Sequence, residues 1–268
     1  QLNANLNDSQ VEAIAKAVEA PDFALIQGPP GTGKSTAIAE LIWQLAQQDS
    51  SQRILITSEA NLAVDNALDK LKSSEHNLVR PIRIAAGDKF SAEGLSYAMP
   101  ELKKWAGVAL TELERQDDEA AHETDEYKSF NPEEVVLSRW LQNIYRRAQE
   151  RISDSDIRRL WFDLMHDCPQ SWRKTVLENY LRHVNVIGAT CSAITDTNYT
   201  ASERRNKRSD SRFIRKYREA FALQQSDNKS LSFNVVIQDE ASKATPAELS
   251  LPLTYGNFYK LNICVSEK

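Results

Sequence analysis

The sequence has few of the features that mark secreted, membrane-spanning and metal-binding proteins. Its three cysteines, Cys168, Cys191 and Cys264, are far apart and odd in number, so they predict neither a disulfide framework nor a metal site and favour a reducing compartment. An apolar run of about eighteen residues is missing, which argues against a membrane-spanning helix. The four histidines show no ligand spacing. We expect an intracellular, cytoplasmic protein without a membrane partner, and a nuclear location is also compatible.

The chain also lacks the excess of positive charge that is typical of proteins binding nucleic acid by bulk charge. Its net charge is −5, a value that still allows a local basic site. The sequence has no internal repeat and no low-complexity tract. Its 268 residues, 41% hydrophobic and 26% charged, have the composition of a globular protein with one large domain or two small ones.

The most informative segment that is present lies at residues 27–36 and reads Gln-Gly-Pro-Pro-Gly-Thr-Gly-Lys-Ser-Thr. It contains the pattern G-x-x-x-x-G-K-[ST] of a phosphate-binding P-loop, between an apolar run and an apolar-faced helix. Lys34 can reach the β- and γ-phosphates, and the Ser35 hydroxyl can ligate Mg²⁺. The alternative is a turn that binds nothing. The residues predicted to bind ATP here are Gly28, Pro29, Pro30, Gly31, Thr32, Gly33, Lys34, Ser35 and Thr36.

Short β-rich runs recur along the chain, and helical stretches separate several of them. The predicted strands are residues 23–26, 53–57, 82–85, 184–188, 233–237 and 261–265. Nearly continuous apolar residues in three of these runs suit parallel strands that are buried on both faces. Asn7, followed three residues later by Gln10, predicts a capping box at the start of the first helix. The predicted fold class is α/β, a parallel sheet flanked by helices.

Two stretches interrupt this alternation of strands and helices. Residues 88–183 are mostly helix-like and charged, and we interpret them as a helical insertion between two parts of the α/β core, residues 1–87 and 184–268. The acidic part of this insertion, residues 112–134, is expected to be a solvated surface.

The second interruption, residues 196–232, is rich in basic side chains with aromatic residues among them. Such a mixture can bind a phosphate backbone and stack a base. The alternative is a solvated basic helix that binds nothing. The residues predicted here to contact single-stranded nucleic acid are Arg204, Arg205, Lys207 and Arg208.

An apolar run that ends in two carboxylates adds the second half of a nucleotide site. Residues 234–240 read Asn-Val-Val-Ile-Gln-Asp-Glu, the form of a Walker B element. Asp239 would hold the Mg²⁺ hydration shell, and Glu240 would polarise the water that attacks the γ-phosphate. Both roles require the strand to end at this point, because adjacent residues of a strand point opposite ways. The alternative is a strand that meets a helix N-terminus, where acids are favoured.

The order of these motifs resembles the first RecA-like domain of superfamily 1 helicases, in the branch of the nonsense-mediated-decay helicase. Residues 6–10 are similar to the Q motif, residues 57–66 to motif Ia, residues 187–193 to motif Ic and residues 239–242 to motif II. The resemblance implies a RecA-like P-loop NTPase fold that uses ATP and Mg²⁺. It further implies that Gln10 reads adenine, and that Asn61 and Thr190 touch single-stranded DNA or RNA.

Each of these three side chains also has a simpler explanation. Gln10 could be only a capping partner, Asn61 could be the N-cap of the following helix, and Thr190 could be an ordinary loop hydroxyl. The predicted catalytic residues are Lys34, Asp239 and Glu240, and the predicted metal ligands are Ser35 and Asp239.

The resemblance departs from the family pattern at two places. Lys243 stands where relatives usually have glutamine, and Ser266-Glu267-Lys268 replaces motif III at the end of the chain. The second RecA-like domain, which supplies arginines to the transferring phosphoryl group, does not follow. We therefore expect the isolated chain to bind Mg-ATP weakly and to lack unwinding activity. The alternatives are a self-contained P-loop interaction module and a non-helicase ATPase or kinase.

Overall fold

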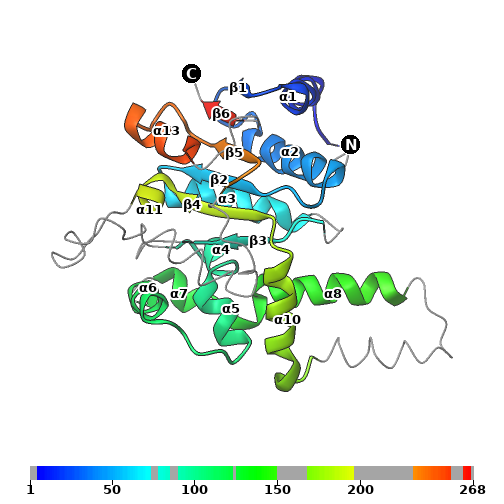
Figure 1. The fold of residues 1–268 in the computed structure, drawn as a ribbon, viewed down its shortest axis with the longest axis vertical. Coiled ribbons are helices and arrows are strands. Elements are labelled where there is room, and N and C mark those ends of the chain that lie inside the picture. Colours follow the sequence, from blue (N-terminus) through cyan, green and yellow to red (C-terminus); the bar gives the residue numbers. More distant parts are fainter. Residues whose placement is uncertain are drawn as a thin grey trace.

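A six-stranded parallel sheet forms the centre of the computed structural model, with strands in the order β1-β6-β5-β2-β4-β3 (Figure 1). The structure describes residues 5–73, 78–84, 90–122, 125–149, 168–195, 232–254 and 262–266. The strands are β1 (Phe23–Gln27), β2 (Ile54–Ser58), β3 (Pro81–Arg83), β4 (Val186–Thr190), β5 (Val235–Gln238) and β6 (Asn262–Ser266). All six predicted strands are confirmed. The fourth and the fifth begin two residues later than expected, at Val186 and Val235.

Helix α1, which precedes the first strand, and the helices that connect the strands cover both faces of the sheet. They are α1 (Asp8–Glu19), α2 (Lys34–Gln48), α3 (Asn61–Lys70), which runs into the short η1 (Leu71–Ser73), α11 (Cys191–Thr195) and α13 (Pro246–Leu253). The crossovers through α2 and α3 move along the sheet in one direction, and those from β4 to β5 and from β5 to β6 return in the other. Right-handed crossovers therefore put α2 and α3 on one face and α11 and α13 on the opposite face.

The described helices of the insertion gather beyond the β3 edge of the sheet, at the end away from β1 (Figure 1). They are α4 (Ala92–Leu95), α5 (Met99–Trp105), α6 (Glu112–His122), α7 (Asp125–Ser129), η2 (Pro132–Glu134), α8 (Val136–Gln149) and α10 (Gln170–Arg182). The last of these leads directly into β4. None of the helices in the described ranges is both long and apolar enough to cross a membrane.

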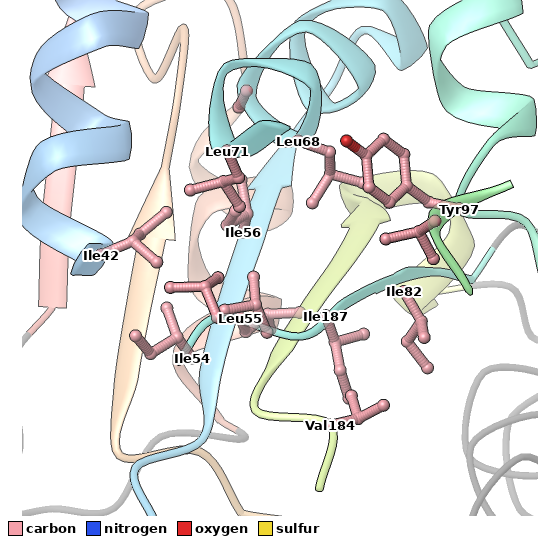
Figure 2. Packing of buried hydrophobic residues seen from close by; sticks show 14 of the residues in the cluster. Ile42, Ile54, Leu55, Ile56, Leu68, Leu71, Ile82, Tyr97, Val184 and Ile187 are labelled. Atoms are coloured by element: carbon pink, nitrogen blue, oxygen red, sulfur yellow. The ribbon is translucent and has the colours of Figure 1, made fainter. Parts of the chain in front are cut away.

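One hydrophobic cluster runs from the sheet into this insertion. Figure 2 shows Leu55 of β2, Leu68 of α3 and Ile187 of β4 in the same cluster as Tyr97, which lies between α4 and α5. At the crossing of α3 over β4, a side chain at Gly188 would overlap Leu68, so glycine permits the helix to approach the strand. The insertion is thus packed on the sheet edge through shared apolar surface.

The acidic stretch of the insertion is less solvated than the sequence suggested. Glu114 is buried and lies 2.6 Å from the Lys103 ammonium, and Asp118 forms an ion pair with Lys104. Burial raises the pKa of the neighbouring Glu101 carboxyl, while the Lys104 ammonium acts in the opposite direction. The expectation of a solvated acidic surface is therefore wrong for Glu114 and Asp118, because two lysines of α5 draw these carboxylates inward.

Candidate nucleotide and nucleic-acid site

The parallel sheet brings the P-loop, Asn61, Thr190 and Asp239 to the carboxyl ends of its strands. Carboxyl ends of parallel strands lie at the same edge of a sheet, where ligands of open α/β folds bind. The P-loop follows β1, Asn61 is the third residue after β2, Thr190 ends β4, and Asp239 follows β5. Strand β6 separates β1 from β5, so two strand spacings, about 10 Å, lie between the strands that carry the P-loop and Asp239.

The P-loop turns sharply into the helix that would receive the phosphates. Gly31 and Gly33 have φ values of 77° and 79°, a left-handed conformation that favours glycine. Helix α2 begins at Lys34, and its N-cap, Gly33, provides no side chain to bond the first backbone N–H groups. A helix of fifteen residues that begins without a side-chain cap offers these N–H groups and its positive dipole end to an anion.

The Lys34 side chain folds back over the P-loop. Its ammonium donates to the carbonyl oxygens of Gly28 and Pro29 at 3.0 and 3.1 Å. The Thr32 hydroxyl donates to the Pro29 carbonyl at 2.8 Å, which tightens the same turn. These hydrogen bonds shape the loop and hold Lys34 beside it.

Gln10 connects the first helix to the P-loop. Its carboxamide oxygen accepts from the Asn7 N–H at 3.0 Å and its backbone N–H donates to the Asn7 side chain at 2.9 Å, which confirms the predicted capping box. Its Nε2 donates to the Thr32 carbonyl at 2.8 Å. A side chain at Gly33 would overlap this Nε2 group, so the contact depends on glycine there. The adenine contact of Gln10 stays a prediction.

The two candidate carboxylates lie where the chain leaves β5. Asp239 is 6% exposed, its N–H extends the pairing to Thr57, and its Oδ1 accepts from the Glu240 N–H at 2.8 Å. Glu240 has a φ of 52°, so the backbone turns out of the strand direction at this residue. The Glu240 carboxylate lies 2.9 Å from the ammonium of Lys243. The strand thus ends where the two carboxylate roles require it to end.

The left-handed backbone of Glu240 predicts an unusual order of stability among variants at this position. For a residue other than glycine, this conformation costs about 1–2 kcal/mol of stability. We expect Glu240→Gly to be more stable than Glu240→Ala by about 1 kcal/mol, or a few degrees in melting temperature. At Glu12, inside α1, the order should reverse, because alanine is the better helix former. If Glu240→Gly were no more stable than Glu240→Ala, the backbone of Glu240 would not be strained.

The two predicted nucleic-acid contacts outside the basic segment have different surroundings. Asn61 is the first residue of α3 and the N-cap is Ala60, so the alternative that Asn61 is the N-cap is wrong. Its Oδ1 accepts from Arg83 Nη2 at 2.7 Å. Thr190 is 1% exposed, and its hydroxyl accepts from the Ala193 N–H at 3.1 Å, at the start of α11. Burial leaves Thr190 little surface for a ligand, and its contact with nucleic acid stays a prediction.

Part of the predicted interface falls outside the described ranges, namely Arg204, Arg205, Lys207 and Arg208. The structure also shows an ion pair that the sequence motifs did not predict. The Arg83 and Asp65 side chains lie 2.8 Å apart, and both are 0% exposed. One feature of the sequence indicates this pair. Arg83 interrupts the apolar run Pro-Ile-Arg-Ile at residues 81–84, and a buried charge in a strand requires a partner.

Comparison with known proteins identifies the family. A family model described as "AAA domain" matches residues 5–206, more than half of the chain. Helicase sen1 of Schizosaccharomyces pombe is 26% identical over 94% of this chain and 16% of its own length. The helicase/nuclease DNA2 of Saccharomyces cerevisiae is 48% identical over 28% of this chain and 5% of its own length.

A further relative is the ATP-dependent helicase MJ0104 of Methanocaldococcus jannaschii, 37% identical over 37% of this chain and 14% of its own length. The chain therefore spans less than a fifth of each of these three relatives. A restriction-modification enzyme solved with a DNA substrate mimic, LlaGI, has a TM-score of 0.39 at 13% identity and covers 97% of this chain and 17% of its own, which is too distant to carry weight. On the family model the chain belongs to the AAA-domain family, and with these relatives its motifs match the first RecA-like domain of superfamily 1 helicases.

Proposed function

We propose that this domain binds Mg-ATP at the P-loop, hydrolyses it with Asp239 and Glu240, and contacts a single nucleic-acid strand at the same sheet edge. The observation that carries the proposal is that the uncapped N-terminus of α2 and the carboxylate pair both lie at the carboxyl ends of the β-strands. Only strand β6 separates the β-strands that lead to them. The first supplies donors for phosphate oxygens, and the second supplies charge for the metal and a base for water.

The donor set suits magnesium. Mg²⁺ prefers hard oxygen ligands and usually keeps several waters, with one or two protein ligands beside the substrate phosphates. Ser35, the second residue of α2, would provide a hydroxyl, and Asp239 a carboxylate already oriented by the Glu240 N–H. In the described ranges, no group of three or more potential ligand side chains gathers to form a cage, so the metal would depend on the nucleotide for further ligands. Bound Mg²⁺ would neutralise charge on the phosphates.

A thermal shift measurement tests the nucleotide half of the proposal. Ligand at about one hundred times its Kd stabilises a protein by about 2.7 kcal/mol, which raises the melting temperature of a chain of this size by several degrees. We expect Mg-ATP to give such a shift and ATP with EDTA to give a smaller one. No shift at millimolar Mg-ATP would contradict the proposal.

Strand translocation and unwinding are proposed for a longer protein that includes this domain. An arginine from another domain can accelerate phosphoryl transfer by about 10³–10⁵-fold in related NTPases. Such an arginine, supplied in trans or by the longer protein, should raise the rate of ATP turnover by this domain.

The basic segment predicts a salt effect on strand binding. Each phosphate neutralised on a single strand contributes about 0.7 to the slope of log Kd against log salt. Replacing Arg204, Arg205, Lys207 and Arg208 by glutamine should therefore reduce the slope by up to about 3, measured by anisotropy with labelled oligo(dT). A matched control replaces four exposed charges elsewhere, Lys16, Arg115, Lys128 and Lys174. An unchanged slope, or the same change in the control, would contradict a specific role for the segment.

A further inference from the structure

A buried guanidinium lies directly beneath Asn61. Arg83, in β3, donates from Nε to Asp65 Oδ1 at 2.8 Å, from Nη1 to the Ile84 carbonyl at 2.8 Å and from Nη2 to Asn61 Oδ1 at 2.7 Å. The side chain is 0% exposed, so Arg83 itself cannot touch a ligand at the surface. Each of its three nitrogens donates to one of these acceptors.

The contact with Arg83 fixes the orientation of the Asn61 side chain. A guanidinium has donors and no acceptor, so the amide must present its oxygen to Arg83 and never its amino group. The Nδ2 amino group therefore projects from the other side of the amide. Asn61 is half-buried, and the next residue, Leu62, is 57% exposed, so this end of α3 reaches the surface. An Asn61 amide held in this way can offer a ligand the hydrogen-bond donor Nδ2.

Asp65 holds the guanidinium from its other side. Its Oδ1 accepts from Arg83, its Oδ2 accepts from the Ser91 N–H at 2.9 Å, and a side chain at Gly94 would overlap the carboxylate. Lysine could pair with Asp65, but a single ammonium on a flexible stem cannot reproduce the planar fork that also reaches Asn61. The fork therefore links Asn61, in the predicted strand-contact motif, to the start of the insertion.

We propose that Arg83 is a positioning residue for strand binding: it holds the Asn61 amide so that Nδ2 donates to an acceptor on single-stranded nucleic acid, such as a phosphate oxygen. This inference rests on the proposed function, and in particular on Asn61 facing the strand. Arg83 contributes no contact of its own, and its effect on affinity is transmitted entirely through Asn61.

A double-mutant cycle tests the link, with labelled oligo(dT) as the probe. Loss of one hydrogen bond weakens binding by about two- to tenfold. We expect Asn61→Ala to weaken strand binding by such a factor, Arg83→Lys to weaken it almost as much, and the double variant to bind no worse than Asn61→Ala. The Mg-ATP melting shift should persist in all three, which separates positioning from general damage. The matched control is Asn66→Ala, an exposed position on the same helix.

A second variant covers the case in which Arg83→Lys does not fold. Asn61→Asp keeps an acceptor for the buried guanidinium but removes the donor, so strand affinity should fall at least as far as with alanine. Additive effects in the cycle, or wild-type affinity in Asn61→Asp, would overturn the positioning role while the proposed function stands. If the wild-type chain binds no strand at all, the nucleic-acid half of the proposed function fails, and this inference fails with it.

Discussion

Replacing Lys34 by alanine should abolish most of the stabilisation that Mg-ATP gives this domain. Charge-assisted hydrogen bonds are worth about 1.5–3 kcal/mol each, so losing two of them to phosphate oxygens weakens binding by about a hundredfold or more. At a concentration of one hundred times the wild-type Kd, the stabilisation would then fall from about 2.7 to about 0.4 kcal/mol. Differential scanning fluorimetry with and without Mg-ATP measures the change.

The stability of the ligand-free variant separates this effect from unfolding. Lys34 is only half-buried, and its ammonium bonds to backbone carbonyls of a loop. The melting temperature without nucleotide should therefore change little. Lys16→Ala, an exposed lysine of α1, is the matched control and should keep the full shift. A full shift in Lys34→Ala would refute the assignment of the P-loop.

Replacing Glu240 by glutamine should remove hydrolysis while leaving nucleotide binding intact. A positioned general base contributes about 10²–10⁴-fold to rate, and a carboxamide cannot accept the proton of the attacking water. Glutamine has the same shape as glutamate and loses only a half-exposed ion pair with Lys243, so the fold should persist. Phosphate release with oligo(dT) present should fall to the background rate.

The Mg-ATP melting shift provides the internal comparison for Glu240→Gln, because it should equal that of the wild type. Glu119→Gln, at an exposed position of α6, removes the same charge far from the carboxyl ends of the strands and should retain activity. Hydrolysis at the wild-type rate in Glu240→Gln would exclude Glu240 as the base. Loss of both hydrolysis and the melting shift would instead assign it to nucleotide binding.

The sequence predicted those features that depend on neighbouring residues. Runs of apolar residues located all six strands, and the spacing of Asn7 and Gln10 located the capping box. The P-loop pattern located the start of α2 because its glycines and Lys34 are adjacent in the chain. Local signals of this kind survive folding, since tertiary contacts reinforce them.

Features that depend on distant residues were not predictable in the same way. The partner of Asn61 is Arg83, 22 residues away, and only the pairing of β3 with β4 and the packing of α3 bring the two together. Similarly, the burial of Glu114 depends on Lys103 in another helix. The left-handed turn at Glu240 has no local signal, because glycine or asparagine is the residue expected at such a φ.

The carbonyl contacts of Lys34 have a consequence for selectivity among anions. Two carbonyl dipoles act as counter-charges for the ammonium in this loop. An incoming anion must replace them, and a small one such as chloride gains little in this exchange. A polyphosphate can engage the ammonium and the helix end together, so it gains enough to displace both carbonyls. We therefore expect this loop to bind polyphosphates much more tightly than small anions.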